Sequence, residues 1–310
     1  MRADLAVIVN PIAGHGRTAT VWPRVAAALG EVGLAFDATP TTGPGHASSL
    51  AAEALRSGYR TIVAVGGDGT VNEVVNGMLS GGEQIDPDVR LGVISSGTGC
   101  DLVRSLGLHR DEDAVPVLKN GLARPIDVGR VAYRDLEGRE CARYFLNVAD
   151  MGLGGEAAEM VNQSSKALGG FLSFLYGAVA AILRYQNKTM EYTLDDGQTI
   201  NGKVSILVVA NGRYFAGGMN VAPRAKLDDG LFDVIILEAT GKADLIFSLL
   251  PSVYRGAHLG HPTVRYTTAR KVTVRSVDRA LLETDGEQLG RDVAEFTIVP
   301  QALRVAAPHL

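Results

Sequence analysis

The chain has 310 residues, enough for two domains, and its 46% hydrophobic and 21% charged residues exclude a disordered chain or a coiled coil. Thirty basic and 34 acidic side chains give a net charge of -4, which provides no overall positive field for a nucleic-acid partner. Only Cys100 and Cys141 are present, without metal or redox spacing, so we expect a cytoplasmic protein that has no disulfide framework.

The first third of the chain alternates short β-branched runs with longer Ala- and Leu-rich segments. Between residue 5 and about residue 107 a strand is followed by a helix four times. Strands this apolar, separated by helices, predict a parallel sheet covered on both faces. We therefore expect an α/β fold that begins with a nucleotide-binding domain over residues 1–124.

The rhythm changes after Arg124-Pro125 to short runs separated by Gly, Asp and Asn, a pattern that predicts antiparallel hairpins. We expect a mainly antiparallel β domain over residues 125–296, with helical insertions near 153–185 and 242–256, and residues 297–310 returning to the first domain. The longest uncharged stretch, 167–183, is shorter than the ~20 residues that cross a bilayer. A buried or interfacial helix is therefore expected there.

Glycine accounts for 37 residues, and many of them follow the predicted strands. In a parallel sheet such junctions lie at the carboxyl edge, where open α/β folds bind ligands. Glycine lets backbone N–H groups approach a polyphosphate, and the next helix points its positive end at it. The pattern predicts a nucleoside triphosphate site made by the four junctions 10–17, 41–46, 66–70 and 95–99.

A dinucleotide site is an alternative, because Gly14-x-Gly16-x-x-Ala19, with Asp37 further along, matches the dehydrogenase fingerprint. That fingerprint requires its first glycine close to the strand, whereas Asn10-Pro11 intervenes here, and it leaves residues 66–70 unexplained. No junction ends in G-K-[ST], which excludes a Walker A loop.

Five further motifs occur along the chain. They are N-P-x-[SA]-G at 10–14, G-G-D-G-T-x-N-E at 66–73, G-T-x-x-D at 97–101, D-D-G-x-[FY] at 228–232 and D-G-E at 285–287. In this order they resemble the bacterial lipid kinases built on the diacylglycerol kinase catalytic domain, which are kin to sphingosine kinases and more remotely to NAD kinase and 6-phosphofructokinase. The resemblance covers the whole chain.

This resemblance implies ATP-dependent transfer of the γ-phosphoryl group to a lipid hydroxyl, with diacylglycerol as the expected acceptor and phosphatidic acid as the product. The first domain would hold ATP, and the second, a β-sandwich, would hold much of the lipid site. The residues implied as ATP contacts are Asn10, Arg17, Thr41, Gly67, Asp68, Gly69, Thr70, Val71, Asn72, Glu73 and Thr98.

Three acidic residues are expected to carry the chemistry. Asp68 lies between phosphate-binding glycines and would repel ATP unless Mg²⁺ lay between them, so it is expected to organise the metal; the alternative is a helix cap. The attacking hydroxyl needs a carboxylate that accepts its proton, and Asp285 or Glu287 is expected in that role. Asp-Gly is also the commonest hairpin turn, which is the competing interpretation of this motif.

A second Mg²⁺ site is implied at Asp229 and the carbonyl of Leu231, with Asp228 as a substitute ligand and Asp101 in a supporting network between the domains. The family tends to carry an acidic residue where this chain has Lys226, and a charged lysine cannot bind Mg²⁺. The lysine would replace the ion by pairing with Asp229, or Asp228 would take over. The same departure leaves open a catalytically silent nucleotide-binding regulator, and a kinase of a soluble acceptor such as NAD is a further alternative.

The expected lipid acceptor requires transient contact with the inner face of a membrane. Two apolar segments, 171–183 and 245–254, lie near Arg184, Lys188 and Arg255, and apolar faces edged with basic side chains suit an anionic interface. Such segments are equally typical of a protein core. The oligomeric state stays open, a homodimer included.

Overall fold

The computed structural model describes residues 3–80, 88–97, 99–108, 113–163 and 170–308. The chain divides into two compact units, one made of Met1–Val128 with Val299–Leu310 and the other of Gly129–Ile298. It passes from one unit to the other within two strands, β5 (Arg124–Asp135) and β14 (Glu287–Val305). The expected cut at residue 124 therefore falls on the first residue of β5.

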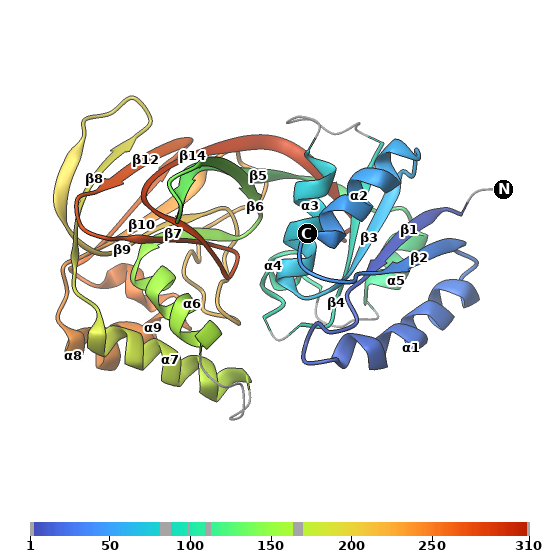
Figure 1. Ribbon diagram of the computed structural model, residues 1–310, viewed down its shortest axis with the longest axis horizontal. Coiled ribbons are helices and arrows are strands. Elements are labelled where there is room, and N and C mark those ends of the chain that lie inside the picture. Colours follow the sequence, from blue (N-terminus) through green and yellow to red (C-terminus); the bar gives the residue numbers. More distant parts are fainter. Residues whose placement is uncertain (1–2, 81–87, 98, 109–112, 164–169, 309–310) are drawn as a thin grey trace. The chain divides into compact units, whose positions relative to one another are not determined.

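The first unit is the expected α/β arrangement (Figure 1). Its strands pair in the order β2-β1-β3-β4, every pair parallel, and the end of β14 adds a parallel neighbour to β4 where Val305 lies opposite Leu91. The strands are β1 (Leu5–Val9), β2 (Phe36–Pro40), β3 (Thr61–Gly66) and β4 (Arg90–Ser95), and the helices are α1 (Arg17–Glu31), α2 (His46–Arg56), α3 (Asp68–Met78), α4 (Asp101–Ser105) and α5 (Ala114–Lys119).

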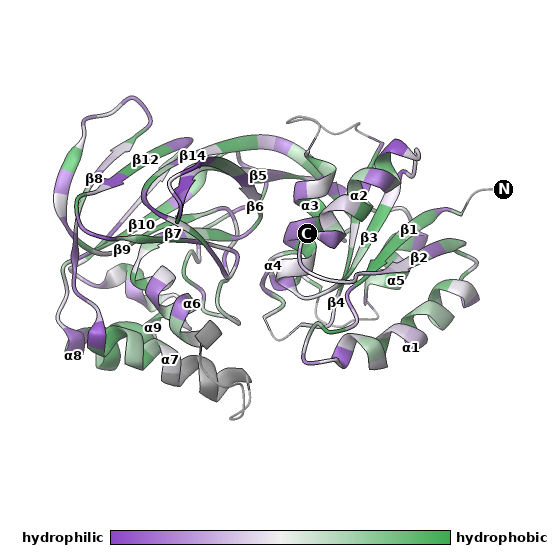
Figure 2. Ribbon diagram, in the orientation of Figure 1, coloured by the Kyte–Doolittle hydropathy of each residue, from purple (hydrophilic) through white to green (hydrophobic). Residues whose placement is uncertain are grey.

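Hydrophobic patterning explains how these elements pack. Every residue of β1 is buried, as expected for a strand covered on both faces, whereas β2 at the sheet edge is mostly exposed. In α1 the buried residues Val21, Val25 and Leu29 recur every four positions and form one apolar stripe. Figure 2 shows the contrast between the uniformly hydrophobic strands β1 and β3 and the mixed surface of α1.

The second unit is the expected antiparallel β domain. Six strands pair in a closed circuit, β7-β13-β14-β12-β8-β9 and back to β7, while β10 and β11 extend it from β9 and β5 and β6 extend it from β14. The strands are β6 (Glu140–Phe145), β7 (Val148–Gly152), β8 (Lys188–Leu194), β9 (Ile200–Ala210), β10 (Phe232–Glu238), β11 (Val264–Ala269), β12 (Lys271–Ser276) and β13 (Leu281–Thr284).

An aromatic core fills this unit. Phe145 stacks on Phe232 with ring centroids 5.7 Å apart and meets Phe296 edge-on at 6.2 Å, and all three side chains are fully buried. Gly129 in β5 is required because a side chain there would collide with the Phe145 ring. Residues of the two strands that run between the units therefore take part in this packing.

The two expected helical insertions are confirmed. The first forms α6 (Leu153–Gln163) and α7 (Gly170–Arg184), and the second forms α8 (Lys242–Asp244), a π turn (Leu245–Leu249), α9 (Leu250–Val253) and a 3₁₀ turn (Ala257–Gly260). Figure 1 shows α6, α7, α8 and α9 on the same side of the strands of this unit. The widened π turn is followed by α9, whose second residue, Pro251, has no N–H to donate. Within the described ranges, no helix has the length and apolar character needed to cross a bilayer.

Candidate active site

Three of the four glycine-rich junctions lie against one another in the first unit. A side chain at Gly14, which follows β1, would collide with the carbonyl oxygen of Ser96, which follows β4. A Cβ atom at Gly97 would lie only 2.7 Å from the Cα atom of Gly67, which follows β3. Glycine is needed at Gly14 and Gly97 because the backbones approach more closely than a side chain allows. Three junctions that are separate in the sequence thus form one cluster of closely packed backbone in the structure.

Asp68 is the first residue of α3 and faces the junction that follows β4. Its Oδ1 atom accepts the N–H of Asp101 at 3.1 Å. A Cβ atom at Gly99 would lie 2.6 Å from Oδ2 of Asp68 and 3.5 Å from Oδ2 of Asp101, so two carboxylates flank one point of the backbone. The N-cap position of α3 belongs to Gly67, which makes Asp68 a helical residue rather than the cap.

Asp101 has a buried carboxylate whose Oδ1 atom pairs with Arg104 at 2.8 Å. This ion pair offsets part of the negative charge that Asp68 and Asp101 bring together. The expected part of Asp101 in a network between the domains stays a prediction, and its ion pair with Arg104 lies within the first unit.

Hydrogen bonds fasten the first junction to its neighbours. Asn10 donates from Nδ2 to Oγ1 of Thr70 at 2.9 Å, and the side-chain oxygen of Asn10 accepts the N–H of Ile12 at 3.3 Å. The buried hydroxyls of Thr18 and Ser96 also share a hydrogen bond, which ties α1 to the end of β4. Ser96 lies in the predicted junction 95–99, whereas Thr18 was not predicted, because the two residues are 78 positions apart and no local motif indicates their hydrogen bond.

Glu73 positions the junction that follows β2. Its two carboxylate oxygens accept the N–H groups of Gly45 at 2.9 Å and Ala47 at 3.2 Å, at the start of α2. A carboxylate at a helix N-terminus stabilises donors that lack a partner within the helix. Thr41 begins the same junction and donates its own N–H to the carbonyl of Val9 at the end of β1. The carboxylate of Glu73 therefore binds backbone at the start of α2, and its expected contact with ATP stays a prediction.

The other expected ATP contacts divide by exposure. Val71 and Asn72 are each 2% exposed, and Asn72 accepts a hydrogen bond from Asn76 one turn later. An ATP contact through either side chain therefore finds no support in this arrangement. Arg17 is exposed at the start of α1, Gly69 lies in the first turn of α3, and Thr98 lies outside the described residues.

The Asp-Gly-Glu motif forms the hairpin turn between β13 and β14. Asp285 and Gly286 have φ angles of 47° and 91°, as a two-residue turn requires, and Thr284 pairs with Glu287 on either side of it. The turn interpretation of this motif is thus correct. It does not exclude the catalytic one, because a non-glycine residue held in the left-handed region often marks a functional site.

Both carboxylates of the motif have defined partners within the second unit. Asp285 accepts the backbone N–H groups of Leu146 at 2.8 Å, Asn147 at 3.0 Å and Val148 at 3.1 Å. Glu287 pairs with Arg143 at 2.7 Å. Three amides from consecutive residues hold the Asp285 carboxylate in one orientation, whereas the Glu287 charge is offset by a guanidinium.

The residues of the expected second Mg²⁺ site lie in the turn before β10. Asp229 accepts the N–H of Leu231 at 3.2 Å in the turn before β10, and Asp228 and Lys226 are exposed. Among the described residues, Lys226 makes no ion pair with Asp229, and no three His, Cys, Asp or Glu side chains gather as metal ligands. The hypothesis that the lysine replaces the ion by pairing with Asp229 is therefore wrong for this structure.

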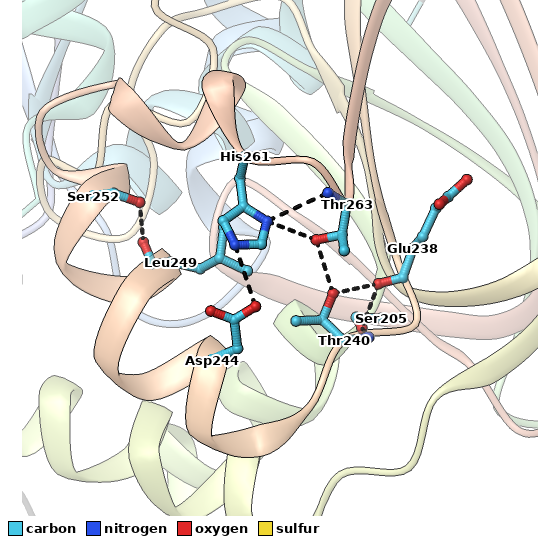
Figure 3. A network of polar contacts seen from close by, with 8 residues as sticks. All are labelled: Ser205, Glu238, Thr240, Asp244, Leu249, Ser252, His261 and Thr263. Carbon is cyan, nitrogen blue, oxygen red and sulfur yellow. Dashed lines mark hydrogen bonds and ion pairs between the residues drawn. The ribbon is translucent and has the colours of Figure 1, made fainter.

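A separate polar network fixes the second helical insertion to the strands (Figure 3). His261 contacts Asp244 through Nε2 at 3.2 Å and the hydroxyl of Thr263 through Nδ1 at 2.8 Å. Thr263 in turn accepts from Thr240, whose backbone N–H donates to Ser205 in β9. The network joins α8, the end of β10 and β9, so the histidine has a structural role.

Comparison with known proteins matches both halves of the chain. Residues 4–131 match the family described as "Diacylglycerol kinase catalytic domain", and residues 147–307 match the "YegS C-terminal NAD kinase beta sandwich-like domain". A diacylglycerol kinase of Bacillus subtilis is 31% identical over 306 residues, which cover 97% of this chain and 95% of that protein. This chain belongs to the diacylglycerol kinase family. It is therefore a lipid kinase, as the five motifs predict.

Further relatives extend the family match over the whole chain. A diacylglycerol kinase of Staphylococcus carnosus is 30% identical over 311 residues, which cover 99% of this chain and 96% of that protein. Two solved structures from Bacillus anthracis, one of them titled as a diacylglycerol kinase, have TM-scores of 0.79 and 0.72 at 22% and 21% identity. Each covers 99% of this chain, with 95% and 98% of the solved chains matched. At these identities the structures support the fold, an α/β unit followed by a β-sandwich-like unit.

Proposed function

We propose that this protein transfers the γ-phosphoryl group of ATP to the free hydroxyl of diacylglycerol and so makes phosphatidic acid. The observation that carries the proposal is the cluster of Gly14, Gly67 and Gly97 at the ends of β1, β3 and β4, next to the carboxylates of Asp68 and Asp101. Backbone that is free of side chains at the start of α3 presents N–H groups to phosphate oxygens. The lipid-kinase relatives supply the acceptor class.

Mg²⁺ fits the donors that this cluster offers. The ion prefers oxygen ligands and is commonly held by one or two carboxylates together with the phosphates of the nucleotide. Asp68 and Asp101 are two carboxylates beside the same glycine, which suits a nucleotide-bound ion better than a site made by protein alone. When bound, Mg²⁺ would neutralise charge on the transferred phosphoryl group. Asp68 and Asp101 are the residues that would hold it.

Asp285 is the residue that we propose as the general base. Phosphoryl transfer needs little covalent help from the protein, so the base must chiefly be held in position. Three backbone amides orient the Asp285 carboxylate, and its half-buried place in the turn leaves it open to an acceptor hydroxyl. Glu287 is paired with Arg143 at 2.7 Å and is proposed to support the turn.

Contact with a membrane surface is proposed through the two helical insertions. Phe247 in the π turn is 80% exposed and Leu183 at the end of α7 is 55% exposed. Lys242 donates to the carbonyl of Leu183, which places a cation beside the apolar side chains, and Arg184 is exposed next to it. Apolar side chains edged with cations bind the surface of an anionic bilayer without crossing it.

The deciding experiment offers the protein labelled ATP, Mg²⁺ and separate acceptors: diacylglycerol, ceramide, sphingosine, phosphatidylglycerol and NAD. We expect label in phosphatidic acid, strongly reduced label with Asp285→Asn and Asp68→Ala, and intermediate label with Glu287→Gln. Circular dichroism of each variant checks that it is folded. Label in NAD alone would make the protein a kinase of a soluble acceptor, and no label in any acceptor despite ATP binding would make it a silent regulator.

A further inference from the structure

Two acidic side chains lie buried beneath the Asp285–Gly286 turn. Asp150 in β7 and Glu283 in β13 stand directly opposite each other in an antiparallel pair, and they are 0% and 1% exposed. Directly opposed residues of antiparallel strands have Cβ atoms ~4.5–5.5 Å apart, so the two side chains are within reach of each other. Neither residue belongs to the five motifs.

The pair lacks the donors that two ionised carboxylates would need. By distance and angle, neither oxygen of Asp150 nor Oε2 of Glu283 has a hydrogen-bond partner among the described residues, and the one backbone donor that acts on Asp150 is the N–H of Gly155, which lowers its pKa. Gly154 and Gly155 bring the start of α6 against the site, because a side chain at Gly154 would collide with the Asp150 carboxyl. Two facing carboxyl groups can bond to each other only if one of them carries a proton.

Glu283 is also bonded to the catalytic turn. Its Oε1 atom accepts the backbone N–H of Gly286, the residue next to Asp285. The N–H of Asp285 donates to the carbonyl of Val148, two residues before Asp150. The backbone of the turn is therefore hydrogen-bonded to β7 and β13, the two strands that carry the buried pair.

None of the described titratable groups around Asp150 and Glu283 supplies a positive charge, so a bound proton is the simplest way to offset their negative charge. The titratable groups that act on the pair are Asp285, which acts on Glu283, and Tyr185 on α7, which interacts with Asp150. Tyr185 is in turn close to Glu156 on α6 and to Asp278. Glu156 is paired with Lys188 at 3.0 Å, Asp278 accepts the N–H of Thr189, and burial raises the pKa of Tyr185, which keeps its hydroxyl neutral. Burial likewise raises the pKa of Asp150 to about 6, and burial together with the Asp150 charge raises the pKa of Glu283 well above its ordinary value. Like charges this close and this far from water do not both ionise.

We propose that Asp150 and Glu283 share one proton at neutral pH, and that the protonated pair positions the Asp285–Gly286 turn for phosphoryl transfer. Glu283 is a positioning residue, because it acts on the reaction only through the turn that carries the base. This role rests on the proposed function of Asp285, whereas the shared proton does not. The pair holds its proton below its own pKa values and loses it as the pH rises. The turn is then no longer supported by a protonated pair.

Isosteric amides test the proposal, because an amide supplies the donor without a proton that can leave. The variants are Glu283→Gln, Asp150→Asn and Glu283→Leu, with Glu191→Gln as the matched control at a partly exposed position of β8. The first measurement is the infrared band of a protonated carboxyl group at neutral pH. We expect the band in the wild type and in the Glu191→Gln control, and its loss in Glu283→Gln and Asp150→Asn.

The second measurement is kcat for diacylglycerol phosphorylation as a function of pH. We expect wild-type kcat to fall on the alkaline side, and Glu283→Gln to retain kcat there, which a merely structural role would not produce. Glu283→Leu removes the acceptor of the Gly286 N–H and should lower kcat by roughly 10- to 100-fold, as a displaced catalytic group does. The KM for ATP should not change, because the cluster proposed to bind the nucleotide belongs to the other unit.

The outcomes separate the two claims. A wild-type protein without the infrared band would overturn the shared proton whatever the activity. If the band is present but Glu283→Gln has the same alkaline profile as the wild type, the positioning role is wrong. If the wild type phosphorylates no lipid, the proposed function fails and takes the positioning role with it, while the band still decides the shared proton.

Discussion

Replacing Gly97 with alanine tests whether the close approach of two junctions makes the ATP site. The added Cβ atom would lie 2.7 Å from the Cα atom of Gly67. Carbon atoms pack best at ~3.5–4.0 Å, so the two junctions must separate by about 0.8 Å or more. The obstacle is backbone on both sides, and no flexible side chain can move aside to make room.

The expected loss follows from this displacement. A misplacement of about 1 Å in an active site can cost roughly 100-fold in rate, so kcat/KM for ATP should fall by about 10- to 100-fold. Overpacking should also lower the free energy of unfolding by about 1–3 kcal/mol, which leaves the protein folded at 25 °C. The assay is steady-state kinetics at varied ATP, with fixed lipid and Mg²⁺, together with an unfolding curve in urea.

Gly43→Ala is the control for this experiment. Gly43 lies in the junction after β2, its added Cβ atom would meet nothing within 4 Å, and its φ angle is not in the left-handed region. A substitution of this kind should change stability by no more than about 0.5 kcal/mol. If Gly97→Ala and Gly43→Ala have the same kcat/KM for ATP, the close approach of Gly97 and Gly67 has no part in binding the nucleotide.

Three further predictions concern stability and membrane contact. Asp150 binds its proton more tightly in the folded protein, so the free energy of unfolding should fall as the pH rises from the unfolded pKa near 3.8 through about 6. The expected fall is roughly 3 kcal/mol. Asp150→Asn should reduce this fall, as measured by urea titrations at each pH. Phe145→Ala should lower the free energy of unfolding by about 3–5 kcal/mol, since three core rings meet there; a loss below 1 kcal/mol would contradict that packing. Phe247→Ser should weaken sedimentation with anionic vesicles and leave the melting temperature unchanged, and equal sedimentation of variant and wild type would place the membrane contact elsewhere.

The motifs and the rhythm of the sequence predicted much of the fold. Alternating apolar strands and helices predicted the parallel sheet of the first unit, because the hydrophobic pattern of a strand buried on both faces is local. The glycine-rich junctions were also visible. Their mutual contacts were not, since the pairing of Gly97 with Gly67 and of Thr18 with Ser96 depends on how distant segments pack.

The candidate site shows the same division between local and distant information. The sequence identified Asp285 and Gly286 as either a turn or a catalytic motif, and the structure makes them a turn whose carboxylate is held by three amides. No pattern in the sequence indicated that Glu283, two residues before Asp285, is buried and accepts a hydrogen bond from the backbone of that turn. The side of a strand on which a residue lies follows from alternation, but its partner across the sheet follows from strand pairing.

By itself, the sequence determined the two kinds of unit, the order of their elements and the family to which the chain belongs, because these depend on short-range patterns and on motifs that are contiguous in the chain. Tertiary structure alone decided that Glu73 accepts hydrogen bonds from the start of α2 and that Asp150 faces Glu283 across two strands. It also decided that Lys226 and Asp229 form no ion pair with each other. Each of these depends on the meeting of segments remote in sequence or on the geometry of a turn. Burial then determines whether two acidic side chains that are brought together can both be ionised.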